Sequence, residues 1–196
     1  MSDPYSTHQT FLKHYIENTS GDIVEFGIGG STGFILNLIK NSNRKLISIE
    51  NNKDWYDKII SQYPPSNKHE YHFVYKWDEF ILNMEKIKYS IVFIDQSPWE
   101  ARVTSLNHFK DVAEYIIIHD VDYYPNNNIF GKHLFDRLYD FSDIFESYGY
   151  YLPENISQPP TLVGSNTKST IYHRDLIIKP NEIEKNTFNG LNFIIQ

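Results

Sequence analysis

The residues that most clearly suggest chemistry lie in the stretch VEFGIGGSTGFIL, residues 24–36. A carboxylate, Glu25, comes before a cluster of glycines, and an apolar run that suits a helix follows them. Glycines between a strand and a helix let the backbone approach a ligand closely. A second carboxylate, Glu50, lies roughly 20 residues beyond the glycines, where nucleotide-binding sheets bind ribose hydroxyls. The pattern therefore predicts a nucleotide-like ligand, and NAD and S-adenosylmethionine both fit this much of it.

Three features favour S-adenosylmethionine over NAD. The glycines follow the spacing G-x-G-x-x-x-G, and Thr32 stands where the dinucleotide fingerprint has its third glycine. The carboxylate of Glu25 would repel a pyrophosphate but would suit an ammonium group. The chain is also short for a separate substrate domain, and it contains no Tyr-x-x-x-Lys pair of the kind that short-chain dehydrogenases use. An NAD-dependent oxidoreductase or epimerase remains the alternative.

The elements that must position this stretch follow from the apolar patterns along the chain. An open parallel sheet needs strands that alternate with helices. Strands are expected at 22–27, 45–50, 70–80, 89–95, 113–120, 147–153 and 159–165, with a weak strand at 169–173 and an uncertain end at 191–196; helices are expected at 5–18, 31–43, 53–63, 99–112 and 130–141. The order predicts an α/β fold, a Rossmann-like open sheet that is mainly parallel, with an antiparallel C-terminal strand and helices on both faces.

Composition limits the class of protein. The 196 residues, 40% of them hydrophobic, suit a single domain with an N-terminal helix (1–20), a core (21–165) and a C-terminal extension (166–196). A net charge of −7 argues against nucleic acid as a partner, and the absence of cysteine excludes disulfides and thiolate chemistry. No apolar run reaches the roughly 20 residues of a membrane helix, and the N-terminal residues MSDPYSTHQT lack the basic-then-apolar layout of a signal peptide. We therefore expect a cytoplasmic protein without a membrane partner, which could form a homo-oligomer.

The stretch VEFGIGGSTG, followed by LISIE, an acid at Asp78 and the strand VFID, resembles class I S-adenosylmethionine-dependent methyltransferases over roughly residues 20–165. The resemblance implies that the glycine turn lines the methionine portion, that Glu50 binds the ribose and that Asp78 meets the adenine. Asn51 departs from the pattern, because an apolar residue often packs on the adenine there. The residues implied to bind the cofactor are Glu25, Gly27, Gly29, Gly30, Ser31, Thr32, Glu50, Asn51, Trp77 and Asp78.

A second segment narrows the resemblance. VFIDQSPWEAR followed by YIIIHDVDYY is similar to the D-x-x-P…R…HD pattern of polysaccharide O-methyltransferases related to the glucuronoxylan type, and more loosely to metal-dependent sugar and catechol O-methyltransferases. The resemblance implies an O-methyltransferase acting on a sugar, nucleotide-sugar or glycan hydroxyl. Arg102 could hold an anionic substrate group such as a phosphate or uronate. The implied catalytic residues are Asp95, His119 and Asp120, and the implied substrate residues are Trp99, Arg102, Tyr123 and Tyr124.

Two mechanisms fit these residues. In one, His119 is a neutral general base whose tautomer is fixed by a carboxylate. In the other, Asp95, Asp120 and Asp122 bind a divalent cation that lowers the pKa of the acceptor hydroxyl. A non-catalytic binding subunit with a methyltransferase fold is a third interpretation of the chain. The remaining histidines, including His8, are expected to be structural.

Overall fold

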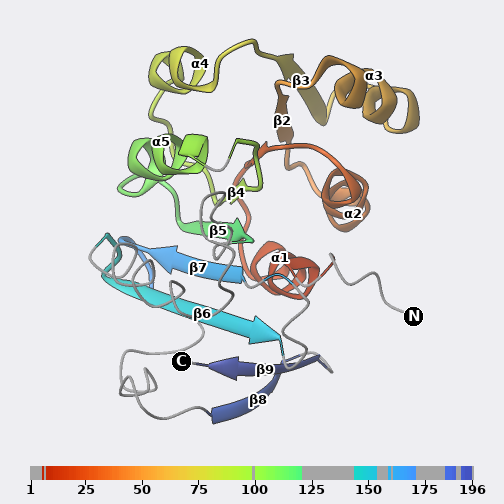
Figure 1. The fold of residues 1–196 in the computed structure, drawn as a ribbon. Coiled ribbons are helices and arrows are strands. Elements are labelled where there is room, and N and C mark those ends of the chain that lie inside the picture. The colour runs from red at the N-terminus through yellow and green to blue at the C-terminus, as the bar shows by residue number, and fades with distance from the viewer. Residues whose placement is uncertain are drawn as a thin grey trace.

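The computed structural model describes residues 6, 8–98, 100–120, 144–153, 159, 161–170, 184–188 and 191–195. Along these residues, strands and helices alternate through the first half of the chain, and strands follow (Figure 1). The elements are α1 (His8–Glu17), β1 (Ile23–Phe26), α2 (Gly30–Ile39), β2 (Leu46–Glu50), α3 (Lys53–Gln62), β3 (His69–Phe73), α4 (Trp77–Asn83), β4 (Ile91–Ile94), α5 (Glu100–Phe109), β5 (Tyr115–His119), β6 (Ser147–Pro153), β7 (Thr161–Ser165), β8 (Glu184–Phe188) and β9 (Leu191–Ile195).

The strands form one sheet in the order β3-β2-β1-β4-β5-β7-β6-β9-β8. Strands β1 to β5 are parallel, so their carboxyl ends meet at one edge of the sheet. Strand β7 runs antiparallel to β5, and the pairs β6–β7, β6–β9 and β8–β9 are antiparallel as well. The predicted α/β fold, with its mainly parallel first part and antiparallel C-terminal part, is confirmed, although β8 was not expected.

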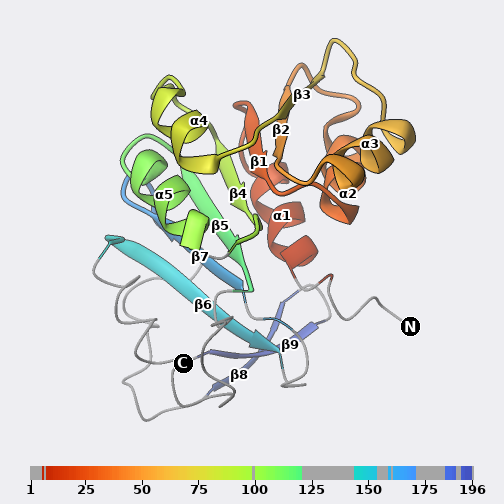
Figure 2. The ribbon, with the colours of Figure 1, turned by 45° about the horizontal axis from the view of Figure 1, so that its top comes forward.

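Helices cover both faces of the sheet, as the sequence predicts. Alternate residues of β4 point to opposite faces, so Val92 packs toward α4 and α5, whereas Phe93 packs toward α1 and α2. Figure 2 shows α4 and α5 on one side of β4 and α1 and α2 on the other. Both sides of the central strands are therefore buried, which explains why their sequences are continuously apolar.

The expected strand at 70–80 is wrong in its second half. Strand β3 ends at Phe73, and the helix α4 begins at Trp77. Trp77 and Ile81 lie one helical turn apart and both bury their side chains in the core. Two acids in the first turn of α4 also favour a helix, because they face the positive end of its dipole. The helix expected at 130–141 lies outside the described residues, and residues 169–170 of the expected weak strand are not in a strand.

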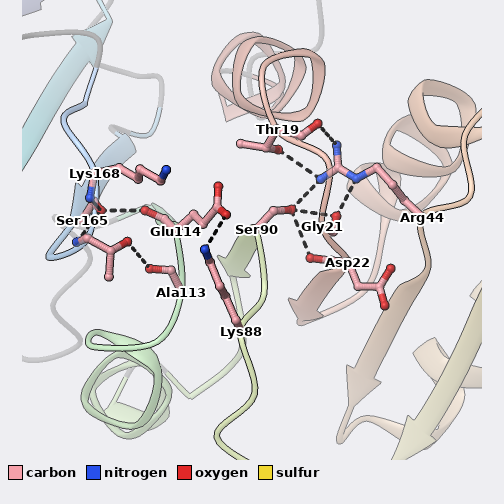
Figure 3. Close-up of polar contacts among 11 residues, drawn as sticks. Thr19, Gly21, Asp22, Arg44, Lys88, Ser90, Ala113, Glu114, Ser165 and Lys168 are labelled. Carbon is pink, nitrogen blue, oxygen red and sulfur yellow. Dashed lines mark hydrogen bonds and ion pairs between the residues drawn. The ribbon is translucent and has the colours of Figure 1, made fainter.

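A buried arginine, Arg44, lies at the amino ends of the parallel strands, with Thr19, Gly21 and Ser90 around it (Figure 3). Arg44 donates from Nε to the carbonyl of Gly21 at 2.6 Å, from Nη1 to the carbonyls of Ile16 and Thr19, and from Nη2 to the hydroxyl of Ser90 at 2.6 Å. These partners lie at the end of α1 and just before β1 and β4. Arg44 therefore joins the N-terminal helix to the sheet by donating to backbone carbonyls at the end of the helix and before the first strand.

Candidate functional site

The first candidate feature is the glycine turn that follows β1. Gly27 has a φ of +86°, and a Cβ atom there would lie 2.6 Å from the carbonyl oxygen of Asp95. Only glycine fits this position, because the left-handed region and the close backbone both exclude a side chain. The next two amides are already bound: Ile28 N donates to Glu50 at 3.1 Å and Gly29 N donates to the hydroxyl of Thr32 at 3.0 Å.

Glu50 links this turn to the loop after β2. Its carboxylate is buried and accepts from three backbone amides, those of Ile28 (3.1 Å), Asn51 (2.8 Å) and Asn52 (2.7 Å). A carboxylate has about four acceptor positions, so about one remains for a ligand donor. Glu50 therefore stands at the carboxyl edge of the sheet, where the sequence predicted a group that binds a ribose hydroxyl.

Glu25 lies behind the glycine turn, with its side chain fully buried. Its carboxylate accepts from the hydroxyls of Ser31, Thr32 (2.8 Å) and Ser48 (2.9 Å). Burial raises the pKa of Glu25 to about 7, although the three hydroxyl donors act in the opposite direction. The carboxylate thus holds the start of α2 against β2. The contact of Glu25 with an ammonium group, as expected from the sequence, stays a prediction.

The second candidate feature is a charged cluster where β4 and β5 end. Asp95 Oδ1 lies 3.2 Å from Arg102 Nη2 and 3.3 Å from His119 Nδ1. Burial would raise the pKa of Asp95, but the hydrogen bond and charge of His119, together with the Arg102 guanidinium, outweigh it and lower the pKa below its usual value. The structure thus brings the predicted residues Asp95 and His119 together. The side chain of Asp95 is 29% exposed, whereas His119 is buried.

Arg102, which the sequence predicts to bind an anionic substrate group, lies in this charged cluster, and its substrate role stays a prediction. The residue is 6% exposed, and its guanidinium donates to the carbonyls of Gln96 (2.8 Å) and His119 as well as to Asp95. A third carbonyl, that of Asp120, lies 3.4 Å from Nη1. These contacts occupy most of the five guanidinium N–H donors. Arg102 joins the end of β4 to the end of β5 and positions the Asp95 carboxylate.

Two residues expected at the adenine lie in different environments. Trp77 is a core residue: it packs against Phe26 and donates from its indole N–H to the carbonyl of Ser97 at 2.8 Å. Its expected contact with adenine stays a prediction. Asp78 is exposed in the first turn of α4 and accepts from the hydroxyl of Thr104 at 2.7 Å. Its contact with adenine stays a prediction.

The fold that positions these residues is similar to that of several solved structures. The chain is similar to an O-methyltransferase from Bacillus cereus in complex with SAH (S-adenosylhomocysteine), with a TM-score of 0.58 and 16% identity over 83% of this chain and 82% of that one. The MTase domain of METTL16 gives a TM-score of 0.57 with 12% identity over 82% and 67% of the two chains. An rRNA methylase from Streptococcus thermophilus gives 0.54 with 14% identity over 83% and 95%. The chain has the methyltransferase fold. No protein-family model and no curated protein matches its sequence.

Within this methyltransferase fold, Trp55 is a candidate site residue that sequence reasoning missed. Its side chain is 39% exposed, and its indole N–H donates to the carbonyl of Ile28 in the glycine turn. A Cβ atom at Gly29 would lie 3.8 Å from the same ring. The available signal was an aromatic residue in the first turn of the helix after Glu50, with Asn52 as its N-cap. The sequence analysis treated residues 53–63 only as an amphipathic helix.

Several predicted residues lie outside the part of the chain that the structure describes, and the described part contains no group of side chains that would hold a metal ion. Trp99, Asp122, Tyr123 and Tyr124 lie outside the described residues. Asp120 has a φ of 55°, a left-handed conformation that aspartate tolerates better than most residues. Among the residues that can be placed, no three His, Asp or Glu side chains are grouped so as to hold a metal ion. In the same part of the chain, no helix combines the length and apolarity needed to cross a membrane.

Proposed function

We propose that this chain is an S-adenosylmethionine-dependent O-methyltransferase. The observation that carries the proposal is the state of the glycine turn. In dinucleotide-binding sheets, the backbone amides of this turn bind the pyrophosphate. Here Glu50 accepts from Ile28 N, and Thr32 accepts from Gly29 N. A pyrophosphate would find these amides occupied and a carboxylate beside them, so the turn suits a nucleoside without phosphates. The fold shared with an O-methyltransferase in complex with SAH supports the same ligand.

The residues present fit this cofactor. Glu50 has about one acceptor position left, which a ribose hydroxyl can use. Gly30 leaves open space where a side chain would stand, so the backbone of the turn can lie close to a ligand. S-adenosylmethionine, when bound, supplies an electrophilic methyl group: the acceptor oxygen gains the methyl carbon and loses its proton, and the electron pair of the broken C–S bond stays on sulfur. The protein must then position the acceptor and remove its proton.

His119 is the base in this proposal. Its Nδ1 faces the carboxylate of Asp95 at 3.3 Å, so in the neutral ring that this proposal requires, Nδ1 carries the hydrogen and donates it. The second nitrogen, Nε2, then has a free lone pair, which is the state a general base requires. Arg102 holds Asp95 in place, and most of its donors are taken by backbone carbonyls and by this carboxylate. General-base catalysis of this kind contributes on the order of 10² to 10⁴ in rate.

The proposed acceptor is a hydroxyl of a small molecule or glycan, such as a sugar, a nucleotide-sugar or a polysaccharide unit. The pattern D-x-x-P…R…HD supports this class, and Asp95 and His119, the first and last parts of that pattern, lie within 3.3 Å of each other. The proposal uses no metal ion, because His119 and Asp95 together supply a base. Methyl transfer is therefore expected to continue in excess EDTA.

Calorimetric titration of the full chain tests the cofactor. S-adenosylhomocysteine should bind at one site per chain, and NAD should not bind. Glu50→Gln should weaken this binding roughly 10-fold or more, the scale of one hydrogen bond to a charged group. The exposed Glu85 provides a matched control, so Glu85→Gln should leave the affinity unchanged. Binding of NAD without binding of S-adenosylhomocysteine would overturn the proposal.

A further inference from the structure

His8, the first residue of α1, lies beside the proposed base. Its ring centroid is 4.3 Å from that of His119, with the rings at 71°, and 5.0 Å from that of Phe93. His8 and His119 are each 5% exposed. The helix α1 packs on β5, and this packing brings the start of the helix to the carboxyl edge of the sheet, where Asp95 lies. The N-terminal helix therefore contributes a histidine to the charged cluster.

Three nitrogen atoms of these two buried rings have no hydrogen-bond partner within the described part of the chain. They are both ring nitrogens of His8 and Nε2 of His119. Buried polar groups nearly always have a partner, and each one left without a partner costs about 1 to 3 kcal/mol. A ring kept only for packing would avoid this cost, since phenylalanine has a similar size and no polar atoms. The three nitrogens are therefore best explained by a ligand that pairs with them.

The charges of His8 and its neighbours decide which kind of ligand can pair with the three ring nitrogens. Burial, and then the neighbouring His119, lower the pKa of His8 to about 3, while Asp95 acts in the opposite direction. His8 is thus neutral near pH 7 and offers one N–H donor and one lone pair. His119 adds a second lone pair at Nε2. A phosphate or carboxylate would need several donors and would lie near the negative Asp95, whereas hydroxyls both donate and accept.

We infer that His8 completes the acceptor site, and that this site takes two neighbouring hydroxyls of an uncharged sugar ring. One hydroxyl donates to Nε2 of His119 and is the one methylated, and the other is bound by His8. The partly exposed carboxylate of Asp95 marks the side from which the ring enters. This inference rests on the proposed function and deepens it, because it assigns a neutral reacting ring and excludes a uronate or phosphorylated ring.

Methyl transfer to simple glycosides tests the inference. The full chain, with methyl-labelled S-adenosylmethionine, is given the methyl glycosides of glucose, galactose and mannose, their single-deoxy analogues, and methyl glucuronide. His8→Phe removes both nitrogens but keeps an aromatic ring against Phe93, and His14→Phe changes a partly buried histidine on the same helix as a control. Affinity for S-adenosylhomocysteine is measured for each protein and should agree within about twofold, because neither histidine lies at the glycine turn.

The expected result has three parts. At least one neutral glycoside is methylated, with kcat/KM at least tenfold above that of the glucuronide. His8→Phe lowers this kcat/KM at least tenfold, equivalent to about 1.4 kcal/mol, while His14→Phe does not. A deoxy analogue that lacks the neighbouring hydroxyl loses at least tenfold with the wild-type chain but less than twofold with His8→Phe. A purely structural His8 would leave that difference between analogues unchanged.

Other outcomes separate the two proposals. Preference for the glucuronide, equal losses for the deoxy analogues in both proteins, or no transfer to any neutral glycoside while S-adenosylhomocysteine binds would each overturn the role of His8. These results would leave the cofactor assignment standing. Failure of S-adenosylhomocysteine to bind would instead overturn the proposed function itself.

Discussion

Replacing Glu25 by glutamine should remove a large pH dependence of stability. The carboxylate of Glu25 is fully buried, and burial raises its pKa from 4.5 to about 7. A difference of roughly 2.5 pKa units corresponds to about 3 kcal/mol, at about 1.4 kcal/mol for each unit. Because the folded pKa is the higher one, the fold favours the protonated acid. The stabilising contribution is complete below pH 4.5 and is lost as the pH rises through 7.

The assay is urea unfolding of the wild-type chain and Glu25→Gln at several pH values from 4.5 to 8. Glutamine cannot ionise, so the free energy of unfolding of the variant, minus that of the wild type, should rise by about 3 kcal/mol across this range. Other titrating groups are common to both proteins and cancel in the difference. Glu85→Gln, at an exposed position, serves as the control and should give a nearly constant difference.

A flat difference for Glu25→Gln would refute this reasoning. If the difference varies by less than about 0.5 kcal/mol, the scale of ordinary surface substitutions, the hydroxyls of Ser31, Thr32 and Ser48 stabilise the ionised carboxylate enough to offset its burial. Glu25 would then be charged at pH 7, and a direct attraction for a cationic ligand would gain support.

Three further predictions concern other parts of the site. His8 has a pKa lowered to about 3, so it stabilises the fold above pH 6.5 and this contribution is lost as the pH falls toward 3; His8→Phe should reduce the loss of stability between pH 6.5 and 4.5, measured by thermal unfolding. Gly27→Ala should destabilise the fold by roughly 2 kcal/mol and weaken the binding of S-adenosylhomocysteine. Gly30→Ala, which has open space at its Cβ, should unfold at nearly the same urea concentration as the wild type. Arg102→Lys should lower kcat at least tenfold with unchanged cofactor affinity, whereas Arg44→Lys, at the opposite edge, should reduce only stability; equal effects on kcat would show that Arg102 has no particular role in catalysis.

Much of the fold could be read from local patterns. Strands β1, β2, β4 and β5 lie within a residue or two of their predicted positions, because short apolar runs between helices are typical of a buried parallel sheet. The prediction failed at residues 70–80, where an aromatic run hides a change from strand to helix. Trp77 and Ile81 have helical spacing, but the strand pattern before them masked it, and the buried surface that favours the helix comes from other elements.

For the site, the sequence by itself determined the glycine turn and Glu50, because spacing after a strand places both at the carboxyl edge of a parallel sheet. Tertiary structure alone decided what Glu25, Arg102 and His8 do. Folding brings hydroxyls to Glu25 and carbonyls to Arg102, which use most of their hydrogen-bonding capacity inside the protein. It brings His8, near the N-terminus, into contact with His119. Both ring nitrogens of His8 are left without a hydrogen-bond partner among the described residues. A side chain's residue type sets which bonds it can make, but the neighbours supplied by the fold decide which of them remain for a ligand.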